Sequence, residues 1–158
     1  MRQHIEQVAK SPPTAHLLKI WRERADDVVE RAVALQSIPA PTFAEQDRAE
    51  EVSRQFTAIG LADVEQDAVG NVYARTPGKD PTRPALLVSA HLDTVFPKET
   101  DLTTRFEADG RIIGAGIGDN SLGLAALISL ADVLTEHDVT PACEIWWVAT
   151  VGEEGLGD

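Results

Sequence analysis

Two stretches near the start of the chain have the hydrophobic spacing of helices that bury one face. Between residues 14 and 36 the apolar positions recur at intervals of three, four and seven, and a second apolar stripe covers residues 49–59. Gly60 suits a left-handed helix end, and Thr42 and Glu45 have the spacing of a capping box. The sequence therefore predicts one helix over residues 14–36 and a second helix that begins at Thr42.

Shorter apolar runs further along the chain are typical of strands. Residues 85–90 and 142–151 are rich in apolar side chains, and residues 71–75 alternate between polar and apolar. Residues 105–113 predict an exposed hairpin, and residues 121–136 predict a mostly apolar helix. This alternation of helices and strands predicts an α/β fold with an open, mostly parallel sheet and helices on both faces. In such sheets, functional groups gather at the carboxyl ends of the strands.

The first 13 residues differ from the rest of the chain. They are polar and end in Ser11-Pro12-Pro13, where each proline fixes φ and removes an amide donor. We therefore expect residues 1–13 to form a loose lead. Residues 14–158 are long enough to form a single domain around one core.

Charge and cysteine content narrow the classes of partner. The 26 acidic residues outnumber the 14 basic residues and give a net charge of -12, which argues against binding to nucleic acid or to an anionic membrane. No apolar run reaches the roughly 20 residues of a membrane span. Cys143 is the only cysteine, so no intrachain disulfide can form, and we expect a cytoplasmic protein.

Polar residues follow three apolar or glycine-rich segments. His91 and Asp93 come after the first buried strand, Asp119 after a glycine-rich turn, and Glu153 and Glu154 after the last strand. Each cluster alone has an ordinary explanation, as a hydrogen-bonded histidine, a helix cap or two solvated glutamates. Burying such groups beside hydrophobic strands costs free energy unless they are paired or bind metal. Their repeated placement at strand ends therefore predicts one shared cation site.

These residue types have complementary roles at a metal site. His91 would bind a metal while Asp93 accepts the second imidazole proton and fixes the tautomer. Asp119 would use both carboxylate oxygens to bridge two cations roughly 3.5–4 Å apart. Of Glu153 and Glu154, one would bind a metal and the other would take a proton from the attacking water.

The three motifs together resemble the zinc-dependent family that includes aminoacylase, acetylornithine deacetylase, succinyl-diaminopimelate desuccinylase, carboxypeptidase G and peptidase T. The matching segments are residues 89–95 (Ser-Ala-His-Leu-Asp-Thr-Val), 118–123 (Gly-Asp-Asn-Ser-Leu-Gly) and 152–155 (Gly-Glu-Glu-Gly). Their order and intervals are similar to those of the family. The resemblance extends from about residue 20 to the last residue.

This resemblance implies a role for each candidate residue. His91 would bind one metal, Asp119 would bridge both metals, and Glu154 would bind the other. Glu153 would be the general base, and Asp93 would orient His91. The implied cofactors are two Zn²⁺ ions, and Co²⁺ or Mn²⁺ is compatible with the same ligands.

The resemblance also implies that the complete enzyme is longer. In the family, a second and smaller domain interrupts a phosphorylase/hydrolase-like zinc peptidase catalytic domain, and a further acidic ligand and a histidine lie downstream. Residues 14–158 would then be the N-terminal portion of a truncated catalytic domain that lacks the lid or dimerisation domain. Each of two metals would have two protein ligands here, whereas catalytic zinc sites usually have three. We therefore expect the isolated chain to bind metal weakly and to show little or no turnover.

Two function classes follow from the sequence. The first is a metal-dependent hydrolase that cleaves a peptide or N-acyl amide bond with metal-activated water, acting on a small peptide or an N-acyl amino acid. The second is a catalytically silent fragment or interaction module derived from such an enzyme. Asn120 and Ser121 stand where many family members have an acidic or methionine residue followed by lysine, which leaves the subfamily and the substrate open. Association into homo-oligomers also stays open.

Overall fold

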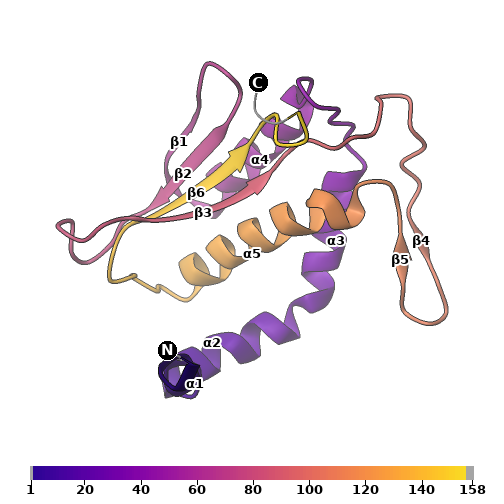
Figure 1. The fold of residues 1–158 in the computed structure, drawn as a ribbon. Helices are drawn as coiled ribbons and strands as arrows, with labels where there is room; N and C mark the ends of the chain where they lie inside the picture. Colours follow the sequence, from indigo (N-terminus) through magenta and orange to yellow (C-terminus); the bar gives the residue numbers. More distant parts are fainter. Residues whose placement is uncertain (1, 156–158) are drawn as a thin grey trace.

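A four-stranded sheet forms the centre of the fold (Figure 1). The computed structural model describes residues 2–155, with side chains from residue 5 onward. The strands lie in the order β1 (Ala62–Gln66), β2 (Val72–Thr76), β6 (Ile145–Thr150) and β3 (Leu86–His91). β3 and β6 are parallel neighbours, and their register pairs His91 with Thr150. The carboxyl ends of these two strands therefore lie together.

The α/β class and the open sheet predicted from the sequence are confirmed. The strand directions differ from the prediction of a mostly parallel sheet, because β1 pairs antiparallel with β2 and β2 pairs antiparallel with β6. Of these elements β1 is the one that the sequence does not predict. It is short, mostly exposed and irregular between Ala62 and Glu65, so it lacks the hydrophobic signal of a central strand.

Helices α4 (Gln46–Ile59) and α5 (Leu122–Glu136) pack on the same face of the sheet. α4 lies against β1 and β2, α5 lies against β3 and β6, and α3 (Ala25–Gln36) packs against α5 (Figure 1). The strand register places the core side chains of the sheet on this face; among them are Val72, Ala74, Trp147 and Ala149. This helical layer forms the main hydrophobic core.

No helix of the described chain packs on the opposite face of the sheet. The sequence predicts helices on both faces, and this part of the prediction is wrong. The uncovered face carries Arg75 and Trp146, which both donate hydrogen bonds to the Glu144 carboxylate. β3 is an edge strand, and its Leu86 and Leu87 side chains are 52% and 62% exposed. The apolar run of residues 85–90 therefore predicted the strand correctly, but this strand lies at the edge of the sheet with exposed leucines and is not buried.

The chain begins with helices where the sequence predicts a loose lead. α1 (Arg2–Ala9) is followed by α2 (Pro12–Glu23), so both prolines lie in the first helical turn. Proline is tolerated there because the first amides of a helix have no partner within the helix. The single helix predicted over residues 14–36 is two helices, α2 and α3, which meet at Arg24.

The segment between β3 and β6 contains the predicted hairpin and the predicted apolar helix. The hairpin consists of β4 (Arg105–Phe106) and β5 (Ile112–Ile113) and projects from the rest of the protein (Figure 1). The turn η1 (Ile117–Ser121) then leads into α5. Within the described chain, Ile117–Glu136 is the one helical stretch long and apolar enough to cross a membrane, but α5 packs against the sheet as core helices do.

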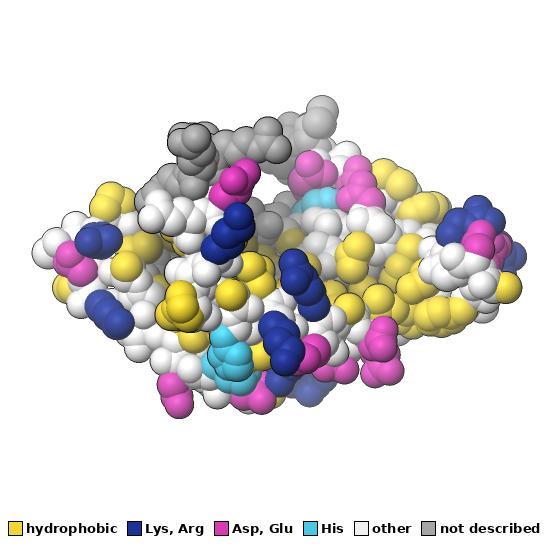
Figure 2. Space-filling model, turned by 90° about the horizontal axis from the view of Figure 1, so that it is seen from below, with side chains coloured by type: hydrophobic (Ala, Val, Ile, Leu, Met, Phe, Trp, Pro, Cys, Tyr) yellow, Lys and Arg dark blue, Asp and Glu magenta, His cyan; other side chains and the backbone are white. Residues whose placement is uncertain are grey.

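The outer surface of the helical layer has mixed chemistry. Figure 2 shows Lys and Arg side chains interspersed with Asp, Glu and hydrophobic groups on the face seen from below. The acidic side chains that give the net charge of -12 therefore do not form one continuous acidic surface on this face.

Candidate metal centre

Three chain segments meet at the carboxyl end of the parallel strand pair. His91 is the last residue of β3, and Glu153 and Glu154 lie in the turn that follows β6. Asp119 lies in η1, just before α5. Because β3 and β6 are parallel neighbours, the residues that follow each strand emerge side by side. The structure therefore brings together the polar clusters that the sequence placed at strand ends.

His91, Asp119 and Glu154 can direct ligand atoms toward a common point. One potential ligand atom from each residue lies within 4.8 Å of the others. The Nε2 atom of His91 is 3.0 Å from an Asp119 carboxylate oxygen and 3.9 Å from a Glu153 carboxylate oxygen. An imidazole nitrogen together with carboxylate oxygens is a donor set that suits Zn²⁺. The residues present therefore fit a bound metal ion.

The side chains of this cluster differ in exposure. Those of Asp119 and Glu153 are 76% and 60% exposed, whereas that of His91 is 12% exposed. The carboxylates can therefore reach an ion or a substrate from the solvent side. The His91 ring is mostly buried, and its Nδ1 atom contacts the protein interior.

The Nδ1 atom of His91 faces Asp93. It lies 3.1 Å from the main-chain carbonyl oxygen of Asp93 and 3.4 Å from the carboxylate of the same residue. A proton on Nδ1 would donate to the carbonyl and leave Nε2 without a proton, which is the tautomer that His91 needs in order to bind a metal through Nε2. The sequence predicts the Asp93 carboxylate as the acceptor of this proton. In the structure the nearer acceptor is the main-chain oxygen.

The Asp93 carboxylate holds the turn that carries the two glutamates. It is fully buried, and its Oδ1 accepts a hydrogen bond from the amide of Glu153 at 3.1 Å. Its Oδ2 accepts hydrogen bonds from the amide of Glu154 at 2.9 Å and from the hydroxyl of Thr42 at 3.1 Å. Asp93 therefore fixes the main chain of Glu153 and Glu154 from the buried side of the candidate site.

Glu45 contacts the same turn one residue earlier. Its Oε1 accepts hydrogen bonds from the amide of Phe43 at 2.9 Å and from the amide of Gly152 at 3.0 Å. The capping box predicted from Thr42 and Glu45 is wrong, because α4 begins only after Glu45 and the Thr42 hydroxyl binds Asp93. These two side chains are used in tertiary contacts instead.

Arg48 is the buried cation beneath the site. Its guanidinium donates hydrogen bonds to the main-chain oxygen of Ile38 at 2.6 Å and to that of Leu92 at 2.7 Å. Burial lowers the pKa of Arg48 to about 10, and the charge of Asp93 opposes this shift. Arg48 is therefore charged at neutral pH and offsets the charge of the buried Asp93 carboxylate.

Sequence reasoning missed Glu45 and Arg48 as parts of the site. Each lies four residues before a core residue of α4, Ala49 and Val52 respectively, and so falls on the face that turns inward. Charged side chains are rarely buried on such a face unless they are paired. Their position on the apolar stripe was the signal that could have revealed them.

The part of the chain that contains this cluster matches the model of a known protein family. The model of peptidase family M28 matches residues 71–157, which is more than half of the chain. This chain belongs to peptidase family M28. M28 members are metal-dependent peptidases, typically zinc enzymes. The resemblance to zinc peptidases and amidohydrolases drawn from the motifs is thus confirmed.

Individual relatives of this M28 chain are longer than it is. An N-carbamoyl-L-amino acid amidohydrolase from Geobacillus stearothermophilus is 29% identical over 112 residues, which cover 71% of this chain and 23% of the relative. The solved structure of a Staphylococcus aureus tripeptidase matches with a TM-score of 0.70 and 27% identity over 82% of this chain and 38% of that one. Human carnosine dipeptidase 1 shares the fold, with a TM-score of 0.71 and 17% identity over 91% of this chain and 35% of that one. The M28 chain thus spans less than two fifths of each relative.

Proposed function

We propose that this M28 chain supplies the metal-binding core of a hydrolase that cleaves a peptide or N-acyl amide bond. The observation that carries this proposal is the convergence of His91, Asp119 and Glu154, whose potential ligand atoms lie within 4.8 Å of one another. The similarity to an amidohydrolase and to a tripeptidase supports the type of bond. Small peptides and N-acyl amino acids are therefore the substrate class to test.

In this proposal the centre holds two Zn²⁺ ions. His91 would hold one ion, Glu154 the other, and Asp119 would bridge them. Co²⁺ or Mn²⁺ would fit the same donors. When bound, such ions polarise a carbonyl group and acidify water. Catalytic zinc sites usually have three protein ligands, so one more ligand for each ion, an acidic residue and a histidine, would come from polypeptide beyond this chain.

Glu153 is the general base in this proposal. Its carboxylate is 60% exposed and lies 3.9 Å from Nε2 of His91, so it borders the position where a ligated substrate would sit. From there it would take the proton of the attacking water and pass it to the leaving nitrogen. Asp93 is a positioning residue, because its buried carboxylate binds main-chain amides.

Calorimetric titration with zinc tests the metal site in the 158-residue chain. We expect saturable binding that is weakened at least about 10-fold by His91→Ala and by Glu154→Gln, because each change removes a ligand. Glu50→Gln is the matched control, since Glu50 is an exposed carboxylate on α4. Equal zinc affinity in all four proteins would place the ion elsewhere and overturn the assignment.

Hydrolysis of dipeptides and N-acetyl amino acids tests the reaction. It is measured with the chain alone and with the chain joined to any downstream polypeptide that its gene encodes. We expect little or no turnover by the chain alone, and in the active form we expect Glu153→Gln to abolish turnover while zinc binding is retained. An extended form that stays inactive with zinc, cobalt and manganese would favour the catalytically silent alternative.

A further inference from the structure

Glu45 is a buried carboxylate that takes no part in the proposed reaction. Its side chain is 5% exposed, and within residues 5–155 no basic side chain forms an ion pair with it. Burying a carboxylate costs free energy unless hydrogen bonds satisfy it. The reason for this glutamate therefore lies in the groups that it binds.

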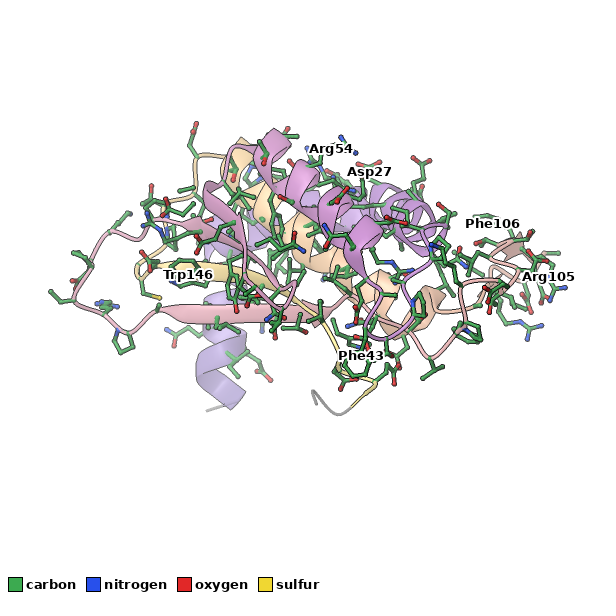
Figure 3. All side chains as sticks on the ribbon, turned by 90° about the horizontal axis from the view of Figure 1, so that it is seen from above. Asp27, Phe43, Arg54, Arg105, Phe106 and Trp146 are labelled. Atoms are coloured by element: carbon green, nitrogen blue, oxygen red, sulfur yellow. The ribbon has the colours of Figure 1, made fainter. Side chains whose placement is uncertain are left out.

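Both hydrogen-bond donors to Glu45 are main-chain amides of loops beside the site. One belongs to Phe43, and the other belongs to Gly152, which is 107 residues away along the chain. Figure 3 labels Phe43 beside the turn that follows β6, and its ring lies close to Gly155 in that turn. Glu45 makes no side-chain capping bond to α4. Helix capping therefore does not account for its carboxylate.

Gly152 is the residue at which the chain turns after β6. Its φ of 70° lies in the left-handed region, which glycine adopts without steric cost. The next two amides, those of Glu153 and Glu154, bind the Asp93 carboxylate at 3.1 and 2.9 Å. Two buried carboxylates thus hold three consecutive amides, and the turn cannot shift without breaking these bonds.

We propose that Glu45 is a positioning residue of the metal centre, which fixes Gly152 and so sets where Glu153 and Glu154 lie. This inference rests on the proposed function, because it assumes that Glu154 binds metal. Glu45 does not belong to the cluster of potential ligands. It acts through the main chain, and its contribution is to reduce the freedom of the turn before metal binds.

Two substitutions of similar size separate this role from simple packing. Glu45→Gln keeps an oxygen acceptor, whereas Glu45→Met keeps the length of the side chain without one. We expect zinc affinity to fall about 10–100-fold in Glu45→Met, the range for outer partners of metal ligands, and to stay within about 3-fold of wild type in Glu45→Gln. Glu50→Met is the control, because it makes the same change at an exposed position of α4.

Two further measurements report on the turn itself in the folded proteins. The visible absorption of bound Co²⁺ depends on ligand geometry, so we expect an altered spectrum in Glu45→Met and the wild-type spectrum in Glu45→Gln. Amide hydrogen exchange should speed up at Gly152 in Glu45→Met alone. A purely structural residue would lower the free energy of unfolding without changing the cobalt spectrum of the folded chain.

The proposal is overturned by a folded Glu45→Met chain that has wild-type zinc affinity and the wild-type cobalt spectrum. If that variant does not fold, Glu45→Asp replaces it, because the shorter side chain withdraws the carboxylate from Gly152. Reduced zinc affinity in Glu45→Asp supports the proposal, and unchanged affinity contradicts it. A wild-type chain that fails to bind zinc is a separate result, because it contradicts the proposed function itself.

Discussion

The floor and the rim of the candidate metal centre use charged residues in opposite ways. The floor consists of Glu45, Arg48 and Asp93, whose exposed fractions are 5%, 1% and 0%. The rim consists of Asp119 and Glu153, whose side chains are 76% and 60% exposed. Each charge of the floor is met by hydrogen bonds from the protein, whereas the carboxylates of the rim are open to solvent. The floor thus fixes geometry, and the rim remains available for an ion.

This difference predicts where substitutions take effect. Removing one member of a buried polar network leaves its partners unsatisfied in a site of low dielectric constant, which lowers the free energy of unfolding. Removing an exposed carboxylate leaves the fold almost unchanged. Substitutions in the floor should therefore appear in stability and in metal binding, and substitutions in the rim should appear in metal binding alone.

Arg48→Met should have the largest effect on stability. Methionine replaces the aliphatic part of the arginine side chain but not its guanidinium. That guanidinium binds the main-chain oxygens of Ile38 and Leu92 and offsets the charge of Asp93. We expect the free energy of unfolding, measured in urea, to fall by about 3 kcal/mol.

The control for this prediction is Arg54→Met on the same helix. Arg54 is exposed and pairs with Glu51 three residues earlier, so its removal should leave the urea midpoint almost unchanged. Figure 3 shows Arg54 on the opposite side of the molecule from Phe43 in that view. Equal losses in both variants would mean that the buried guanidinium has no special role in the floor.

Asp93→Asn should have an intermediate effect on stability and a clear effect on metal binding. The new amide group turns a donor toward the amide of Glu153 or Glu154, so one of those hydrogen bonds is lost. We expect the free energy of unfolding to fall by about 2 kcal/mol and zinc affinity to fall about 10-fold or more. Unfolding in urea and calorimetry with zinc measure the two effects. Lower stability with unchanged zinc affinity would limit Asp93 to a role in folding.

The elements predicted best are those whose signal lies within the element itself. α5, β3 and β6 have nearly continuous apolar runs, and each is found close to its predicted range. The start of α4 was misplaced because the Thr42 hydroxyl and the Glu45 carboxylate bind groups 51 and 107 residues away. A local capping rule cannot anticipate such distant partners.

The same distinction applies to the candidate site. The approach of His91 to Glu153 and Glu154 was predictable, because these residues end or follow strands and parallel neighbours share an end. The floor was not predictable in the same way. The apolar stripe of α4 indicates that Glu45 and Arg48 turn inward, but their partners depend on how this region packs against the residues that follow β3 and β6. The sequence thus predicted the candidate ligands more readily than the residues that contact their main chain.

Asp119→Asn should have the smallest effect on stability and tests the rim directly. Because the side chain is 76% exposed, we expect the free energy of unfolding in a chelator to change by less than about 0.5 kcal/mol. Zinc at 100 times its Kd should stabilise the wild type by about 2.7 kcal/mol, and Asp119→Asn should lose most of this gain at the same zinc concentration. Asp27→Asn on α3 is the control, since Asp27 is also exposed and should keep the full gain. If Asp119→Asn instead destabilised the metal-free chain as much as Asp93→Asn does, the rim would share the structural role of the floor, and the division between them would not hold.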